Sequence, residues 1–190
     1  MNPSESLFPV FLKLTGRKVV LVGGGTVATS KLGALLDTGA AVTVVAPQIT
    51  RKIASSNAVI KQRGFEPADL NAAWLVVAAA PPAVNHEVSR AAESRNLFVN
   101  AVDDPPNASV YLGGVVRRSG VTVAISTDGK APALAGLIRQ ALDTLLPEKE
   151  VKRWLSVAQT QRATWTKDNV SIDQRRPLLL RALAGLYQDE

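Results

Sequence analysis

A continuous aliphatic run that ends in three glycines constrains this chain more than any other feature. Residues 18–22 read Lys-Val-Val-Leu-Val and stop at Gly23 to Gly25, after which residues 27–36 carry apolar side chains at helical spacing. A second aliphatic run occupies residues 41–45. Short uninterrupted aliphatic runs are typical of strands buried in a parallel sheet. The segment therefore predicts a strand, a glycine turn, a helix and a second strand.

The glycine turn matches the dinucleotide fingerprint G-x-G-x-x-G/A with Gly23, Gly25 and Ala28 at its three small positions. The first glycine permits the tight turn, the second lets the backbone approach a pyrophosphate, and the third small residue lets the helix lie close to the strand. The helix N-terminus adds partial positive charge. Glycine clusters also form ordinary turns, but the flanking strands and helix favour dinucleotide binding here.

The second strand lacks the acidic residue that often binds the adenosine ribose, since Ala46, Pro47 and Gln48 follow it. Either another group, Gln48 or the backbone, contacts the ribose, or the ribose site is degenerate. Arg51 and Lys52 lie close by, so spacing alone does not decide between NAD and NADP. We expect NAD to be bound by Gly23, Gly24, Gly25, Thr26, Val27, Ala46, Pro47, Gln48 and Ala80.

Aliphatic and helical segments continue to alternate up to residue 102. Strands are predicted over 59–65, 73–80 and 97–102, and a helix over 84–96. This alternation predicts an α/β fold, a Rossmann-type parallel sheet with helices on both faces.

The pattern changes beyond residue 103. Two extended segments, 110–118 and 121–127, are separated only by Ser119 and Gly120, which predicts an antiparallel hairpin extension. Helical spacing then predicts helices over 133–146, 150–164 and 173–187. We expect a dinucleotide-binding domain over 1–112, a hairpin and helix over 113–147 that form the dimerisation and substrate region, and a small helical C-terminal domain over 148–190.

Composition excludes several kinds of chemistry. The chain has no cysteine and a single histidine, His86, so thiolate or histidine-built metal sites are ruled out and we expect no resident metal. Its 22 Lys and Arg against 16 Asp and Glu give a net charge of +6, which favours a nucleic acid, a membrane surface or a small acidic molecule as partner. Neither a leader nor a membrane span is recognisable, and we expect a cytoplasmic location. The tryptophans do not interleave with basic residues, which argues against nucleic acid.

Two loops are candidates for the chemistry. Asp103 and Asp104 follow the fifth predicted strand, where a carboxylate can act as a general base, although Asp-Asp-Pro-Pro is also an ordinary turn sequence. Residues 126–130, Ser-Thr-Asp-Gly-Lys, can form either an anion cradle or a capped connection to the next helix. His86 is more typical of a surface side chain than of a catalyst.

Four segments together resemble one known family. They are Val20–Ala28, Val42–Pro47, Val99–Asp103 and Val123–Ala135. In order and spacing, residues 7–147 resemble the precorrin-2 dehydrogenase family, which comprises stand-alone siroheme-synthesis enzymes and the N-terminal module of siroheme synthase. Ala-Pro after the second strand is usual in that family.

The resemblance implies a function. Family members use NAD to oxidise precorrin-2, an acidic tetrapyrrole with eight carboxylates, to sirohydrochlorin, and many also insert Fe2+ as a substrate to give siroheme. It implies that Asp103 is the catalytic acid/base group, that Ser126 and Thr127 lie near the tetrapyrrole, and that the chain forms a homodimer. Basic side chains suit a substrate with many carboxylates, so Lys130 and Arg117 complete the expected substrate contacts.

The sequence departs from the family pattern at three places near the expected crevice. Gly113-Gly114 replaces a Pro-Ala pair, Pro81-Pro82 stands where Asp or Asn is usual, and Asp128 stands where Gly or Asn is common. These departures bear on iron insertion and on the substrate more than on the cofactor. Two alternative hypotheses remain open: a dinucleotide-sensing regulatory module without catalysis, and a nucleic-acid binder that uses the positive charge.

Overall fold

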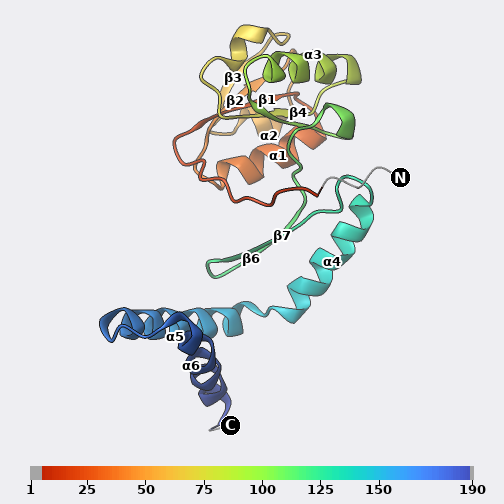
Figure 1. The fold of residues 1–190 in the computed structure, drawn as a ribbon. Helices are drawn as coiled ribbons and strands as arrows, with labels where there is room; N and C mark the ends of the chain where they lie inside the picture. Colours follow the sequence, from red (N-terminus) through yellow and green to blue (C-terminus); the bar gives the residue numbers. More distant parts are fainter. Residues whose placement is uncertain (1–5, 189–190) are drawn as a thin grey trace. The chain divides into compact units, whose positions relative to one another are not determined.

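The computed structural model describes residues 6–188 (Figure 1). The chain divides into two compact units, residues 1–112 and 113–190, which are called unit 1 and unit 2 and are described separately.

Unit 1 is built on a five-stranded sheet in the order β3-β2-β1-β4-β5, and all of its strand pairs are parallel. The strands are β1 (Lys18–Val22), β2 (Ala41–Val45), β3 (Val59–Lys61), β4 (Leu75–Ala78) and β5 (Phe98–Ala101). Strand order reverses between β1 and β4, and such a reversal opens a crevice at the carboxyl ends of the strands. The predicted Rossmann-type sheet is confirmed.

The helices of unit 1 lie on opposite faces of this sheet, with α1 on one face and α3 on the other (Figure 1). Successive side chains of β1 alternate between the two faces: Val19 and Leu21 pack in the cluster that contains α1, and Val20 and Val22 in the cluster that contains α3. This alternation explains why β1 is aliphatic throughout. The helical segments are α1 (Thr26–Leu36), α2 (Arg51–Ala54), α3 (Pro82–Glu93) and the 3-10 turns η1 (Pro67–Leu70) and η2 (Pro105–Asn107).

Helix α3 begins two residues before the predicted start at Val84. Pro81 caps the helix and Pro82 occupies its first turn, where a missing N–H costs no hydrogen bond. The amides of Val84 and Asn85 donate to the Pro81 carbonyl. The unusual Pro-Pro pair therefore serves as a helix start.

Strand β3 is shorter than predicted because its continuation turns toward a buried carboxylate. Asp69 is 1% exposed, and it accepts hydrogen bonds from Lys61 Nζ at 2.7 Å and from Arg63 at 2.6 and 2.8 Å. Burial by itself would raise the pKa of Asp69, but these hydrogen bonds and the one from the Glu66 amide outweigh it and hold that pKa well below its usual range. The ion cluster ties β3 to η1.

Unit 2 contains the hairpin and three helices. Strands β6 (Gly114–Arg118) and β7 (Val121–Ile125) pair antiparallel across Ser119 and Gly120, both of which have positive φ as a tight hairpin turn requires. Helix α4 (Pro132–Leu145) packs on β6, and α5 (Glu148–Lys167) packs on α6 (Ile172–Ala184), which the 3-10 turn η3 (Gly185–Tyr187) extends. The predicted hairpin and helices are confirmed, but β6 begins at Gly114 rather than at Val110, whose amide donates to the Val99 carbonyl of β5 instead.

A polar cluster ties η3 to the first turns of α5. The Tyr187 hydroxyl donates to Glu150 at 2.5 Å and accepts from Trp154 Nε1 at 2.6 Å. The hydrogen bond to Glu150 raises the pKa of Tyr187, and it lowers the pKa of Glu150. Among residues 6–188, no helix is long and apolar enough to cross a membrane.

Candidate functional site

The glycine turn forms a close-packed loop at the carboxyl end of β1. Gly23 has φ 129° and donates its amide to the Val45 carbonyl at 3.0 Å. A Cβ at Gly23 would overlap the Ala79 carbonyl oxygen, and one at Gly24 would overlap the Gln48 carbonyl oxygen. Any side chain at either position would therefore displace the backbone that follows β4 or β2.

Gly25 differs from its two neighbours because a Cβ built there would meet nothing within 4 Å. It caps α1 without a side chain, and it is exposed together with Thr26 and Val27. The first amides of a helix have no carbonyl one turn earlier to bond, so they face outward as donors. The loop is thus an open cradle lined by N–H groups, and it fits the pyrophosphate of a dinucleotide.

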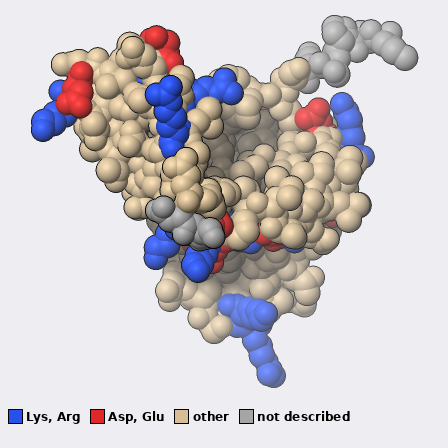
Figure 2. All heavy atoms as spheres, turned by 90° about the horizontal axis from the view of Figure 1, so that it is seen from below, with Lys and Arg blue, Asp and Glu red and all other residues tan. Residues whose placement is uncertain are grey.

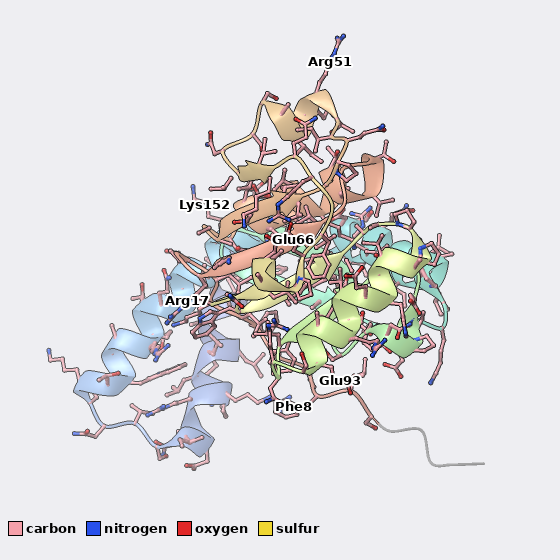
Figure 3. The ribbon with its side chains drawn as sticks, turned by 90° about the horizontal axis from the view of Figure 1, so that it is seen from above. Phe8, Arg17, Arg51, Glu66, Glu93 and Lys152 are labelled. Atoms are coloured by element: carbon pink, nitrogen blue, oxygen red, sulfur yellow. The ribbon has the colours of Figure 1, made fainter. Side chains whose placement is uncertain are left out.

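The residues expected at the adenosine end pack directly against this cradle. Ala46 is buried, Pro47 and Gln48 are exposed, and the Thr50 amide donates to the Gly24 carbonyl at 2.9 Å. The Gln48 side chain is therefore free to reach a ribose from the loop beside Gly24. Arg51 projects from α2 away from the sheet (Figure 3).

The end of β4 contributes a residue that sequence reasoning missed. Asn85 is 3% exposed, and its Oδ1 accepts from the Ala80 amide at 3.0 Å, which orients the segment after β4 beside the glycine loop. Asn85, Val88 and Ala92 share one face of α3 and are all buried. An amide at a core position of an amphipathic helix is the signal that could have identified it.

The structure distinguishes the two aspartates after β5. The Asp104 carboxylate accepts from Asn107 Nδ2 at 2.8 Å. Asp103 is exposed, and its carboxylate has no hydrogen-bond or ion-pair partner within residues 6–188. Val102, just before it, donates to the Ala78 carbonyl of β4 at 2.9 Å, so the turn lies at the same edge of the sheet as Ala80. Asp103 is the carboxylate that is available to accept a proton.

The expected substrate residues belong to unit 2. Ser126 and Thr127 accept through their hydroxyls from the amides of Asp128 and Ala131, at 3.1 and 3.2 Å, so both shape the connection between β7 and α4. Lys130 is exposed and lies 3.6 Å from the Asp128 carboxylate. Asp128 has φ 55°, the left-handed region that Gly and Asn adopt most readily and that Asp also tolerates.

Arg117 lies apart from this loop. It pairs with Thr122 near the hairpin turn, whereas Gly114 pairs with Ile125 beside Ser126. Three residues of strand separate these positions, which corresponds to roughly 10 Å. Its role in substrate binding remains a prediction.

The positive charge does not form a continuous surface on the face of the molecule seen from below (Figure 2). On the face that Figure 2 shows, Lys and Arg side chains are dispersed rather than gathered into one stripe. Arg118 and Arg139 both pair with Asp143, at 2.7 and 2.8 Å. Within the described part of the chain, no group of three or more His, Cys, Asp or Glu side chains is placed to hold a metal ion.

Comparison with known proteins finds a family model that matches part of each unit. A family model for NAD(P)-binding domains matches residues 10–114, and a model for the central part of sirohaem biosynthesis proteins matches residues 118–144. The chain belongs to the siroheme synthase and precorrin-2 dehydrogenase family. Its NAD(P)-binding model covers the glycine cradle, Asn85 and Asp103, in agreement with the predicted cofactor.

Individual relatives within this family are similar along much of the chain. Siroheme synthase 3 of Aeromonas hydrophila is 43% identical over 145 residues, which cover 74% of this chain and 31% of that protein. The siroheme synthase of Photorhabdus laumondii is 38% identical over 184 residues, covering 94% of this chain and 39% of that protein. The chain thus spans less than half the length of these curated relatives.

Among solved structures, SirC, a precorrin-2 dehydrogenase, is similar with a TM-score of 0.72 and 28% identity. The similarity covers 92% of this chain and 88% of SirC. Unlike the longer siroheme synthases, SirC has nearly the same extent as this chain.

Proposed function

We propose that this chain oxidises precorrin-2 to sirohydrochlorin with NAD+, as a step of siroheme biosynthesis. The oxidation removes one hydride and one proton from the tetrapyrrole, and it yields NADH and a released proton. The observation that carries the proposal is the unpartnered Asp103 carboxylate at the same sheet edge as the open glycine cradle. The similarity to SirC over nearly its whole length supports the same reaction.

The cradle and the carboxylate have separate tasks. Bound NAD+ supplies the hydride acceptor, and Gly25, Thr26 and Val27 offer backbone amides to its pyrophosphate. Asp103 accepts the proton that leaves the substrate, because an exposed carboxylate without a partner is free to reach a reacting carbon–hydrogen or nitrogen–hydrogen group. Asp104 keeps its hydrogen bond to Asn107 and has no proton-transfer role.

We assign substrate binding to polar and basic residues of unit 2. Lys130 and Arg117 are exposed and can pair with carboxylates of the tetrapyrrole. The Ser126 and Thr127 hydroxyls accept backbone hydrogen bonds, and each still has its own proton to donate.

Three finer points belong to the same proposal. The chain works as a homodimer in the cytoplasm, and it can insert Fe2+ into sirohydrochlorin, with iron as a substrate. The dimer and iron insertion rest on the resemblance to the family, and the location rests on the sequence, in which no leader or membrane span is recognisable. Gel filtration with light scattering tests the dimer, and addition of Fe2+ to the finished oxidation tests metal insertion.

The decisive experiment incubates the purified protein with precorrin-2 and NAD+ and follows formation of sirohydrochlorin and NADH by absorbance. Asp103→Asn should retain NAD+ binding and lose at least roughly 100-fold in kcat, the usual contribution of a general base. Asp104→Asn should lose less of its kcat, because the Asp104 carboxylate stabilises the turn through its hydrogen bond from Asn107. Equal activity of wild type and Asp103→Asn would overturn the role of Asp103.

The rival hypothesis of a dinucleotide-sensing module predicts a different result. The wild type would then bind NAD+ with no turnover of precorrin-2 under any condition. A wild type that binds NAD+ but does not oxidise precorrin-2 would therefore refute the enzyme hypothesis and favour the sensing module.

A further inference from the structure

The turn that carries Asp103 has a backbone conformation that must be held in place. Asp103 has φ 57°, in the left-handed region, which costs a non-glycine residue about 1 kcal/mol or more. Such a conformation persists only where surrounding contacts enforce it. Element η2 begins two residues after Asp103. Its contacts therefore determine the position of the Asp103 carboxylate.

The segment that follows Asp103 borders a cavity beside α3 and β5. Pro106, Asn107 and Ser109 line a cavity of about 460 Å³, whose opposite wall includes Ser89 and Phe98 of α3 and β5. The Ser89 hydroxyl is buried and has no hydrogen-bond partner in the described residues, whereas the Ser109 hydroxyl accepts from the Val99 amide of β5 at 2.9 Å. The turn must be positioned by hydrogen bonds at its ends.

A chain of three side chains provides one such link to α3. Asn107 Nδ2 donates to Asp104 Oδ2 at 2.8 Å, and His86 Nδ1 lies 3.3 Å from Asn107 Oδ1. Because the Asn107 nitrogen is directed at a carboxylate, its oxygen must face His86, and an amide oxygen can only accept. The His86 Nδ1 atom therefore carries the proton and donates.

We propose that His86 is a positioning residue for Asp103. His86 acts through Asn107 and Asp104, and it anchors the η2 turn to helix α3. This inference rests on the proposed function, in which Asp103 accepts the proton. It also gives a role to the single histidine of the chain. Glu87 and Arg90 are the charged neighbours on the same helix, and no ion pair joins either of them to another residue between 6 and 188.

The hydrogen-bond chain can be tested without any substrate. His86 is the only histidine, so the ring nitrogens of protein purified without a histidine tag give one unambiguous set of 15N signals. At about pH 8, where a free imidazole is neutral, the wild type should show the Nδ1–H tautomer. Asn107→Ala should shift the ring toward the Nε2–H tautomer that free histidine favours. Identical spectra for the two proteins would overturn the link.

Kinetics then test the positioning role. His86→Leu should lower kcat for precorrin-2 oxidation by roughly 3- to 10-fold, the value of one hydrogen bond, with unchanged Kd for NAD+. His86→Asn should restore most of kcat, because its Nδ2 atom lies where Nδ1 of histidine does and can donate to Asn107. Glu87→Gln, one position away on α3, is the matched control and should leave kcat unchanged.

These outcomes separate the inference from the proposed function. If the wild type oxidises precorrin-2 and His86→Leu is equally fast, the positioning role fails and the function stands. If the wild type does not oxidise precorrin-2, the function fails, while the tautomer still reports whether the His86–Asn107 link exists. If His86→Asn is as slow as His86→Leu, the donor role of the ring is refuted.

Discussion

The carbonyl oxygen of Gln48 lies where a Cβ on Gly24 would have to be, so the loop after β2 packs directly on the backbone of the glycine turn. A Cβ on the next residue, Gly25, would meet no atom within 4 Å. We therefore expect two adjacent glycines to be required for different reasons, Gly24 by the packing of the protein and Gly25 by the bound dinucleotide.

This difference predicts opposite behaviour of two alanine variants. Gly25→Ala should change the free energy of unfolding by less than about 1 kcal/mol and weaken NAD+ binding at least roughly tenfold, because the added methyl occupies space beside the pyrophosphate. Gly24→Ala should lower the free energy of unfolding by about 1–3 kcal/mol, because a backbone carbonyl must move. Urea unfolding and NAD+ titration by calorimetry measure both effects. If the Gly25→Ala variant folds and binds NAD+ with normal affinity, the pyrophosphate does not bind at this loop.

The ion cluster around Asp69 should make unit 1 sensitive to acid. Asp69→Asn should lower the free energy of unfolding at neutral pH by about 2–4 kcal/mol, because Lys61 and Arg63 lose the charge that they share. The folded-state pKa of Asp69 lies below its unfolded value. Its contribution is therefore complete above the unfolded pKa and is lost as the pH falls toward the folded one.

Urea unfolding monitored between neutral pH and about pH 3 checks this dependence. The difference between wild type and Asp69→Asn should shrink as the pH falls. A difference that stays constant over this range would show that the charge of Asp69 is not what stabilises the cluster.

Unit 2 offers a second matched pair of glycines. A Cβ at Gly113 would overlap the Ile125 carbonyl oxygen, so Gly113→Ala should destabilise the hairpin by about 1–3 kcal/mol. Gly136 lies within α4 and has nothing within 4 Å of a Cβ, so Gly136→Ala should stabilise the helix by about 0.5–1 kcal/mol. Circular dichroism during urea unfolding compares them. Equal stability of the two variants would refute this packing of β6 on β7.

Tyr187 should titrate at higher pH in the wild type than in Glu150→Gln, because the carboxylate that accepts its proton raises its pKa. The contribution of this bond to stability is present below the unfolded pKa of tyrosine and is lost as the pH rises through the folded value. Phenolate absorbance measured against pH in the two proteins reports the shift. Superimposable titrations would exclude the Tyr187–Glu150 hydrogen bond in solution.

Local patterns were sufficient where one short segment carried the whole signal. Strands β1 and β2 have the bounds that their aliphatic runs predict, and the glycine turn lies where the fingerprint requires it. Helix α3 begins at Pro82, two residues before the predicted start, because proline suits a first helical turn. Helix α2, with only four residues, has too little periodicity to be recognised from sequence.

The chemistry of the turn after β5 illustrates what sequence leaves undecided. By itself the sequence determined a dinucleotide cradle and placed two identical carboxylates after the fifth strand, because glycines and strand ends are local features. Only the tertiary structure decided which carboxylate is free: Asn107 and His86 come from different segments and meet beside Asp104, which leaves Asp103 without a partner in the described residues. Adjacent aspartates are chemically the same, and contacts made by folding give them different partners.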